Sequence, residues 1–355
     1  ARIAPFGLIW LLFSVIYSLL ERGLLGELNY YPATGNPYNF GGTVFITACM
    51  AVFCGLLIGS VEVLYLNRLF INRSFLQKVI FKTGIYLTFI ILFLLMTTLL
   101  FNAYALQQNI FAPEVVRNTA IFFTNFAFWS VTFYIACIIG ISLFFHEVSE
   151  NIGHGVVTNF FSGRYHTPKQ EERIFMFLDM KSSTTLAEQM GHGRYFTMLK
   201  AYFADLSAPI IDYSGEVYQY AGDEMIITWT LKKGLHNNAC IHCFFALKQA
   251  LQQHAEKYKS QFGVLPAFKA GLHAGTVTTG EIGVIKREII FTGDVLNTTA
   301  RIQSLCNAYN TDILLSADLV RRLSADESFV VLSLGEVELR GRDKRVELFS
   351  VSGKT

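Results

Sequence analysis

The sequence predicts a chain of two parts, an α-helical membrane domain with four spans followed by a polar α+β domain. The composition is 52% hydrophobic and 16% charged over 355 residues, whereas an average soluble domain carries about 25% charged residues. Residues 1–145 contain only seven Lys or Arg and four Asp or Glu, whereas residues 146–355 contain 22 and 23. The change in composition predicts a membrane domain over 1–145, a helical linker over 146–172 and a second domain over 173–355.

Four apolar segments fill the first part, at residues 5–25, 43–65, 83–106 and 119–145. Each reaches the roughly 20 residues that a helix needs to cross the hydrocarbon core of a bilayer. The first segment has no cleavage site of small residues, so we interpret it as a retained span rather than a signal peptide.

The loop between the second and third spans sets the expected orientation. It carries Arg68, Arg73, Lys78 and Lys82 and no acidic residue, and such basic loops lie in the cytoplasm. Four spans then place both ends and the polar part in the cytoplasm as well. We therefore expect a multi-pass protein of the cell (inner) membrane, in contact with lipid, whose second domain is cytoplasmic.

The spans themselves favour an anchor or a sensor over a transporter. Apart from Glu21 and Arg22, which we assign to the connection after the first span, Glu62 is the one charged residue inside a predicted span, and it lies near a cytoplasmic end where it can reach the interface. The external loop 28–42 is rich in Tyr, Asn, Pro and Gly. It is expected either to bind an external ligand or to serve only as a connector with turn residues.

Charge and cysteine usage exclude other classes of function. The second part is nearly neutral, so no basic face indicates binding to nucleic acid. Cys240 and Cys243 have the two-residue spacing of zinc ligands, but no second ligand pair matches it. We expect both thiols to be packed in a helix.

The first candidate site in the polar part follows a predicted buried strand. Residues 174–179 end in Asp179, and residues 180–185 (MKSSTT) then open a helix. The unpaired N–H groups at a helix start suit phosphate oxygens, and a carboxylate suits Mg²⁺. The alternative is that Asp179 and Ser182 only cap the helix.

A predicted hairpin supplies a second acidic residue. Two alternating strands, 216–220 and 225–229, flank a tight turn that contains Asp223. If the hairpin lies beside the first strand, Asp223 and Asp179 converge from two strand ends. Paired carboxylates can hold two divalent ions about 3.5–4 Å apart, so phosphoryl transfer is the expected class of reaction.

Two further polar residues lie on a later predicted helix. Asn297 and Arg301 are four residues apart and so share one helix face. An amide and a guanidinium one turn apart can orient a ribose and stabilise charge at phosphorus. The alternative for Arg301 is an ordinary surface ion pair.

Five segments together resemble the catalytic domain of class III nucleotide cyclases over residues 173–352. They are FLDMKSST, YQYAGDEM, GLHAGTVTTGEIG, TGDVLNTTARI and LGEVELRGR. The resemblance implies a ferredoxin-like α+β domain that works as a head-to-tail homodimer with active sites at the interface. It also implies conversion of a nucleoside triphosphate to a 3′,5′-cyclic monophosphate and pyrophosphate with two divalent cations, Mg²⁺ or Mn²⁺.

The resemblance also assigns roles to individual positions. Asp179 and Asp223 match the metal-binding aspartates, with the backbone carbonyl of Met180 as a further ligand. Asn297 and Arg301 match the ribose-orienting and transition-state residues that the opposite subunit supplies. The expected phosphate-binding residues are Ser183, Thr184 and Arg340, where Arg340 replaces the usual Lys and Ser182-Ser183 replaces the usual Gly-Phe.

Selection of the base is where the sequence departs most from the family. The two base-recognition positions are Gln219, where adenylate cyclases usually have Lys, and Ile290, where they have Asp or Thr. A Gln amide can donate to adenine or accept from guanine. We expect ATP as the substrate, which makes the chain an adenylate cyclase, with guanylate or pyrimidine nucleotide cyclase as the alternative.

Two other functions compete with this interpretation. Residues 221–225 (AGDEM) approximate the GGDEF signature of diguanylate cyclases, but that family has no equivalent of Asn297 and Arg301. The chain could instead be a catalytically silent cyclase-like membrane receptor. Both candidate metal ligands and both candidate transition-state residues are present, which argues against a catalytically inactive receptor.

Overall fold

The computed structural model describes residues 2–26, 39–70, 73–152, 163–339 and 345–354. The chain divides into two compact units, residues 1–157 and 158–355, and each is described by itself. Arg340, one of the predicted phosphate-binding residues, and most of the predicted external loop 28–42 lie outside the described residues.

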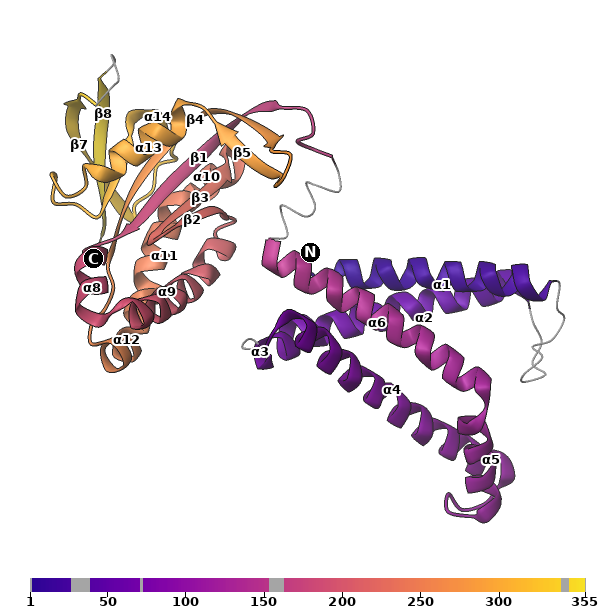
Figure 1. The fold of residues 1–355 in the computed structure, drawn as a ribbon. Coiled ribbons are helices and arrows are strands. Elements are labelled where there is room, and N and C mark those ends of the chain that lie inside the picture. Colours follow the sequence, from indigo (N-terminus) through magenta and orange to yellow (C-terminus); the bar gives the residue numbers. More distant parts are fainter. Residues whose placement is uncertain (1, 27–38, 71–72, 153–162, 340–344, 355) are drawn as a thin grey trace. The chain divides into compact units, whose positions relative to one another are not determined.

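The first unit is entirely helical in its described parts (Figure 1). Its elements are α1 (Ala4–Leu25), α2 (Phe40–Val61), the π-helical turn η1 (Glu62–Leu66), α3 (Asn67–Leu69), α4 (Phe75–Leu106), α5 (Pro113–Thr124) and α6 (Phe126–Ile152). Four helical segments are long and apolar enough to cross a membrane: Ala4–Leu25, Phe40–Leu66, Phe75–Tyr104 and Phe126–Asn151. The four predicted spans are therefore present as helices.

Small residues let α1 and α2 pack closely. A Cβ atom at Gly55 would lie 2.8 Å from the carbonyl oxygen of Phe6, and one at Gly59 would lie 2.9 Å from the Phe6 ring. Glycine at both positions removes these clashes, as is typical where membrane helices pack backbone to backbone. Trp10 fills the space beside Gly55 and is buried.

The boundaries of the third and fourth spans differ from the prediction. The third helix already begins at Phe75, so Lys78 and Lys82 belong to α4 and not to a loop. Residues 119–124 belong to the separate helix α5, which begins at Pro113 and ends before Asn125. Asn125 is extended, with ψ 134°, and its side chain accepts a hydrogen bond from the N–H of Ala127 at the start of α6. Hydropathy alone does not reveal the break between α5 and α6, because both helices contain apolar residues on either side of it.

A buried charge cluster joins three helices of this unit. Lys82 is fully buried on α4, and its Nζ lies 2.5 Å from Oε1 of Glu62 and 2.7 Å from Oε1 of Glu147 on α6. Lys78 approaches Glu147 at 3.2 Å, and the Tyr86 hydroxyl donates to Glu62 at 3.1 Å. The expectation that Glu62 reaches the membrane interface is therefore wrong, because its side chain is paired inside the helix bundle.

The second unit is built on one eight-stranded mixed sheet (Figure 1). The strand order is β2-β3-β1-β4-β6-β8-β7, and β5 pairs with β4. Among the strand pairs that the structure describes, β4–β6 alone is parallel. The strands are β1 (Lys169–Met180), β2 (Glu216–Ala221), β3 (Glu224–Thr230), β4 (Phe268–Ile282), β5 (Glu288–Thr292), β6 (Ile313–Ser316), β7 (Phe329–Val337) and β8 (Val346–Gly353).

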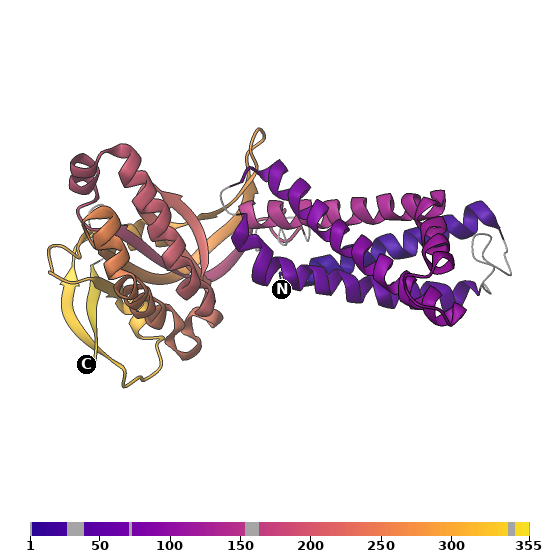
Figure 2. The ribbon, with the colours of Figure 1, turned by 90° about the horizontal axis from the view of Figure 1, so that it is seen from below.

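Helices cover both faces of the central strands (Figures 1 and 2). Along β1, alternate residues face opposite sides. Ile174, Met176 and Leu178 pack with α9 and α11, while Phe175 and Phe177 pack on the face of α13. The helices are α8 (Ser183–Met190), α9 (His192–Asp212), α10 (Leu231–Leu235), α11 (Ala239–Gln253), α12 (Ala255–Phe262), α13 (Asp294–Ser304) and α14 (Ala317–Val320), with a short 3₁₀ turn at His236–Asn238.

The predicted fold class is confirmed, because four apolar helices precede an α+β unit with a mixed sheet. In the predicted linker 146–172, residues 146–152 continue α6 and residues 169–172 begin β1, while 153–162 lie outside the described residues. Cys240 and Cys243 are buried in α11, and burial raises the pKa of the Cys240 thiol to about 12. The prediction that they are packed thiols is confirmed.

Candidate active site

Asp179 lies near the end of the central strand β1, between β3 and β4. Its Cα is paired with Glu224 on one side and with Lys269 on the other. Its carboxylate Oδ2 accepts a hydrogen bond from Nε2 of Gln303 at 3.1 Å, and Nζ of Lys269 lies 3.4 Å from the same oxygen. The side chain is 27% exposed, so it is accessible to a ligand.

Asp223 reaches the same end of the sheet through the predicted hairpin. Ala221 of β2 pairs with Glu224 of β3, which leaves Gly222 and Asp223 as a two-residue turn. Gly222 has φ +66°, a value that side chains with a Cβ rarely adopt and that such hairpin turns require. Because Glu224 pairs directly with Asp179, the turn places Asp223 next to Asp179, as predicted from the sequence.

The closeness of these acids affects their pKa values. Burial raises the pKa of Asp179, and the negative charge of Asp223 raises it further, against the opposing effects of Lys269 and Gln303. The pKa of Glu224 is also raised, first by burial and then by both aspartates. Glu224 was not among the candidate site residues predicted from the sequence. The strand register shows that it lies opposite Asp179 and so belongs to the same acidic group.

The donor set of this carboxylate group suits a hard divalent cation. Oxygen ligands are what Mg²⁺ and Mn²⁺ prefer, and adjacent desolvated carboxylates gain from a cation that neutralises their repulsion. The buried hydroxyl of Tyr202 has no hydrogen-bond partner in the described part of the chain, and its pKa is raised first by burial and then by nearby negative charge, including that of Asp179 and Asp223. Within the described ranges, no three His, Cys, Asp or Glu side chains are arranged to hold a metal, so the site as it stands offers two aspartates and backbone oxygen.

The start of α8 follows Asp179 directly. Ser182 has φ +57° and makes no side-chain cap, so the interpretation of this residue as a simple helix cap is wrong. The Ser183 hydroxyl bonds to Tyr195, and Thr184 is exposed. The first N–H groups of α8, four residues after Asp179 in the chain, therefore receive no capping side chain from Ser182.

The other candidate residues lie on α13. Asn297 is exposed and Arg301 is half-buried, one turn apart on the helix. No interaction joins either side chain to Asp179 or Asp223 within the described part of the chain. The structure brings Gln303, two residues further along α13, to Asp179 instead.

The two positions predicted to recognise the base lie on strands whose aromatic residues Tyr218 and Phe291 pack together on the α13 face of the sheet. Gln219 is exposed on β2, and Ile290 is half-buried on β5. Their neighbours Tyr218 and Phe291 pack ring to ring with centroids 4.8 Å apart. The guanidinium of Arg173 lies 4.6 Å from the Phe291 ring centroid, which fixes β5 against β1.

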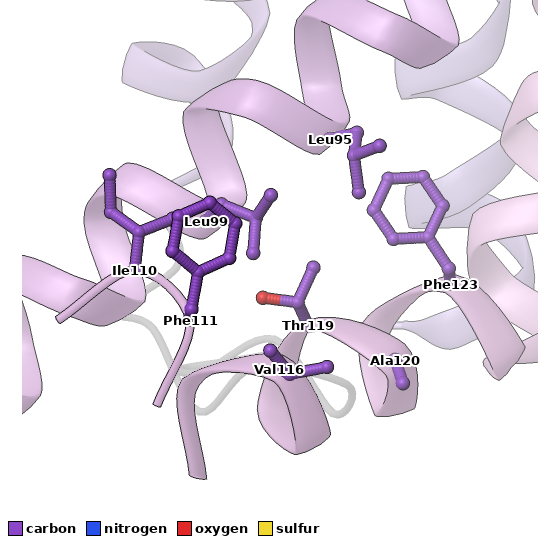
Figure 3. Close-up of a pocket in the computed structure, with 8 residues that line it drawn as sticks. All are labelled: Leu95, Leu99, Ile110, Phe111, Val116, Thr119, Ala120 and Phe123. Carbon is purple, nitrogen blue, oxygen red and sulfur yellow. The ribbon is translucent and has the colours of Figure 1, made fainter. Parts of the chain in front are cut away.

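A pocket between α4 and α5 in the first unit differs in chemistry from this site (Figure 3). Leu95, Phe111 and Phe123 contribute apolar side chains to its wall. Thr119 contributes a hydroxyl, which donates to the carbonyl of Val115. The lining is almost entirely apolar, in contrast to the carboxylates of the site in the second unit.

Comparison with known proteins identifies the second unit. Residues 166–353 match the sequence model of the adenylate and guanylate cyclase catalytic domain. The chain is 37% identical over 210 residues, 59% of its length, to "Adenylate cyclase 2" of Rhizobium meliloti (strain 1021). It is 28% identical over 182 residues to "Adenylate cyclase" of Anabaena cylindrica.

These matches are partial with respect to the relatives. The chain spans 58% of the Rhizobium meliloti protein and 36% of the Anabaena cylindrica protein. A solved bacterial light-regulated adenylyl cyclase is 23% identical, with a TM-score of 0.47 over 53% of this chain and 54% of that one. Since the family model covers more than half of the residues, the chain belongs to the adenylate and guanylate cyclase catalytic domain family.

Proposed function

We propose that the chain is a membrane-anchored class III nucleotide cyclase that converts ATP to 3′,5′-cyclic AMP and pyrophosphate. The observation that carries the proposal is that the strand register places Asp179 and Asp223 together, on a strand end that leads within three residues into the uncapped start of α8. Carboxylates for cations and N–H groups for phosphates are the two requirements for binding a nucleoside triphosphate.

The reaction forms a bond between the ribose 3′ oxygen and the α-phosphorus and breaks the bond from that phosphorus to the bridging oxygen of pyrophosphate. The proton of the 3′ hydroxyl passes to water or to a phosphate oxygen. When bound, two Mg²⁺ or Mn²⁺ ions would supply Lewis acidity for the 3′ hydroxyl and would neutralise phosphate charge. Asp179, Asp223 and the carbonyl of Met180 would hold them, while Ser183, Thr184 and Arg340 bind the phosphates.

Asn297 and Arg301 act from a second copy of the chain in this proposal. Asn297 orients the ribose, and Arg301 stabilises the negative charge that develops at the α-phosphate. The exposure of Asn297 and the lack of a bond from either residue to the aspartates of its own chain support a homodimer with sites at the interface. Each copy then supplies cation ligands to one site and α13 residues to the other.

The choice of ATP rests on relatives rather than on the base-recognition residues. Gln219 can present a donor to adenine or an acceptor to guanine, and Ile290 offers no side-chain hydrogen bond. Both named relatives are adenylate cyclases, which favours ATP over GTP or a pyrimidine triphosphate.

The four apolar helices support a membrane anchor. Arg73 lies before α4 and Arg2 before α1, and basic residues at these ends favour a cytoplasmic location for both. We place the cyclase unit on the cytoplasmic side of the cell membrane for this reason, with the spans as an anchor or sensor.

The substrate assignment is tested by incubating membranes that contain the full chain with each of the four nucleoside triphosphates and Mn²⁺. Mass spectrometry should detect cyclic AMP as the main product, and excess EDTA should abolish it because it removes the cations that would neutralise the phosphate charge. Cyclic GMP or a cyclic pyrimidine nucleotide as the main product would overturn the choice of base. Turnover that persists in EDTA would overturn the metal-dependent chemistry.

A further inference from the structure

Gln303 makes a direct contact with the acid that is central to the proposed site. Gln303 is only 6% exposed, and its Nε2 donates a hydrogen bond to Oδ2 of Asp179 at 3.1 Å. A carboxylate only accepts hydrogen bonds, so the NH₂ end of the amide must face it. Lys269 approaches the same Oδ2 at 3.4 Å. The other oxygen, Oδ1, has no protein donor among the described residues and remains available to a cation.

The position of Gln303 against the sheet depends on a glycine in the strand next to β1. A Cβ atom at Gly271 of β4 would lie 2.4 Å from the backbone nitrogen of Gln303 and 2.7 Å from its Cα. Any larger residue would push α13 away from the sheet. Gly271 pairs with Phe177, two residues before Asp179 on the same face of β1. The backbone of α13 is therefore closest to the sheet where Gln303 reaches Asp179.

The same helix carries the residues that the proposed function assigns to the partner's site. Residues two apart on a helix are separated by about 200°, so Arg301 and Gln303 lie on nearly opposite faces of α13. Arg301 is half-buried and Gln303 is buried against the sheet. One rigid helix thus has a contact to Asp179 on one face and the Asn297 and Arg301 pair on the other.

We propose that Gln303 is a positioning residue of the cyclase site. It holds Oδ2 of Asp179 so that Oδ1 stays oriented for a divalent cation, and it fixes α13 relative to that carboxylate. The inference rests on the proposed function and deepens it. Second-sphere hydrogen bonds of this kind typically change metal affinity by about 10- to 100-fold when they are removed.

The test compares Gln303→Met with the wild-type chain in detergent-solubilised protein. Met is similar in length and apolar, so it fills the site without donating a hydrogen bond. Electron paramagnetic resonance measures the concentration of free Mn²⁺ and so gives the affinity of each protein for the ion. We expect Gln303→Met to bind Mn²⁺ at least about tenfold more weakly than the wild type. Turnover at low Mn²⁺ should fall by a similar factor and recover at saturating Mn²⁺, whereas a merely structural defect would not respond to the metal.

Two further variants complete the design. Gln303→Asn keeps the amide but shortens the chain by one methylene, so it should weaken Mn²⁺ binding in the same way even if Gln303→Met folds poorly. Ser304→Ala, at the neighbouring exposed position of α13, is the matched control and should bind Mn²⁺ as the wild type does. Wild-type affinity in both Gln303 variants would overturn the positioning role. The binding measurement requires no turnover, so it tests the role of Gln303 independently of catalysis. A wild-type chain that forms no cyclic nucleotide would instead overturn the proposed function.

Discussion

Replacing Asp179 by Asn is expected to lower kcat/KM for cyclic nucleotide formation by roughly 10³-fold or more, equivalent to about 4 kcal/mol of lost transition-state stabilisation. The amide keeps the shape of the side chain and removes the charge that would hold a cation. The rate is measured with purified full chain at saturating Mn²⁺. Asp212→Asn, at an exposed position at the end of α9, is the matched control and should retain wild-type activity.

Loss of activity in this variant should not come from loss of folding. Burial and Asp223 raise the pKa of Asp179, so the ionised carboxylate costs stability when no cation is bound. We expect Asp179→Asn to melt at or above the wild-type temperature in EDTA. Metal-dependent turnover close to the wild-type rate would show that Asp179 is not a metal ligand.

Replacing Lys82 by Met is expected to destabilise the membrane unit by about 3–5 kcal/mol, because it leaves the buried carboxylates of Glu62 and Glu147 without their shared cation. The measurement is the unfolding free energy in mixed detergent micelles. Lys78→Met is the matched control, since Lys78 is partly exposed and, among the described residues, forms an ion pair with Glu147 alone. We expect a smaller loss from Lys78→Met.

A triple variant separates lost charge balance from lost packing. Adding Glu62→Gln and Glu147→Gln to Lys82→Met removes the charge of Glu62, which the single change leaves unpaired, and the charge of Glu147, which then has only Lys78 as its cation among the described residues. Much of the stability should return. A Lys82→Met chain as stable as the wild type would contradict the view that this cluster ties α2, α4 and α6 together. If the triple variant is as unstable as Lys82→Met, the loss of stability comes from lost packing rather than from unpaired charge.

The sequence was sufficient to predict the carboxylate pair but not its surroundings. Asp179 ends an apolar run and Asp223 lies in a turn between two alternating strands, and both patterns are local. Gln303 lies 124 residues from Asp179 in the chain, and only the close approach of α13 at Gly271 brings them together. Such contacts depend on the packing of a helix onto a sheet, which has no periodic signature in sequence.

The buried charge cluster shows the same limit in the membrane unit. Hydropathy located the four spans, but Lys82 and Glu147 fell outside the predicted third and fourth spans, and Glu62 was assigned to the interface. The observed helices extend beyond the apolar core of each segment, so charges at three different helix ends meet inside the bundle. A charged residue ends an apolar run in sequence, but it does not end a helix when a partner is available.

A mixed dimer tests the central claim most directly, namely that each active site combines the aspartates of one chain with Asn297 and Arg301 of another. Asp179→Ala and Asn297→Ala chains with different affinity tags are co-expressed, and dimers that carry both tags are purified. Each variant alone should be inactive, whereas each mixed dimer should contain one intact site and recover about half of the wild-type activity per dimer. Mixed dimers that remain as inactive as either parent would contradict the shared site.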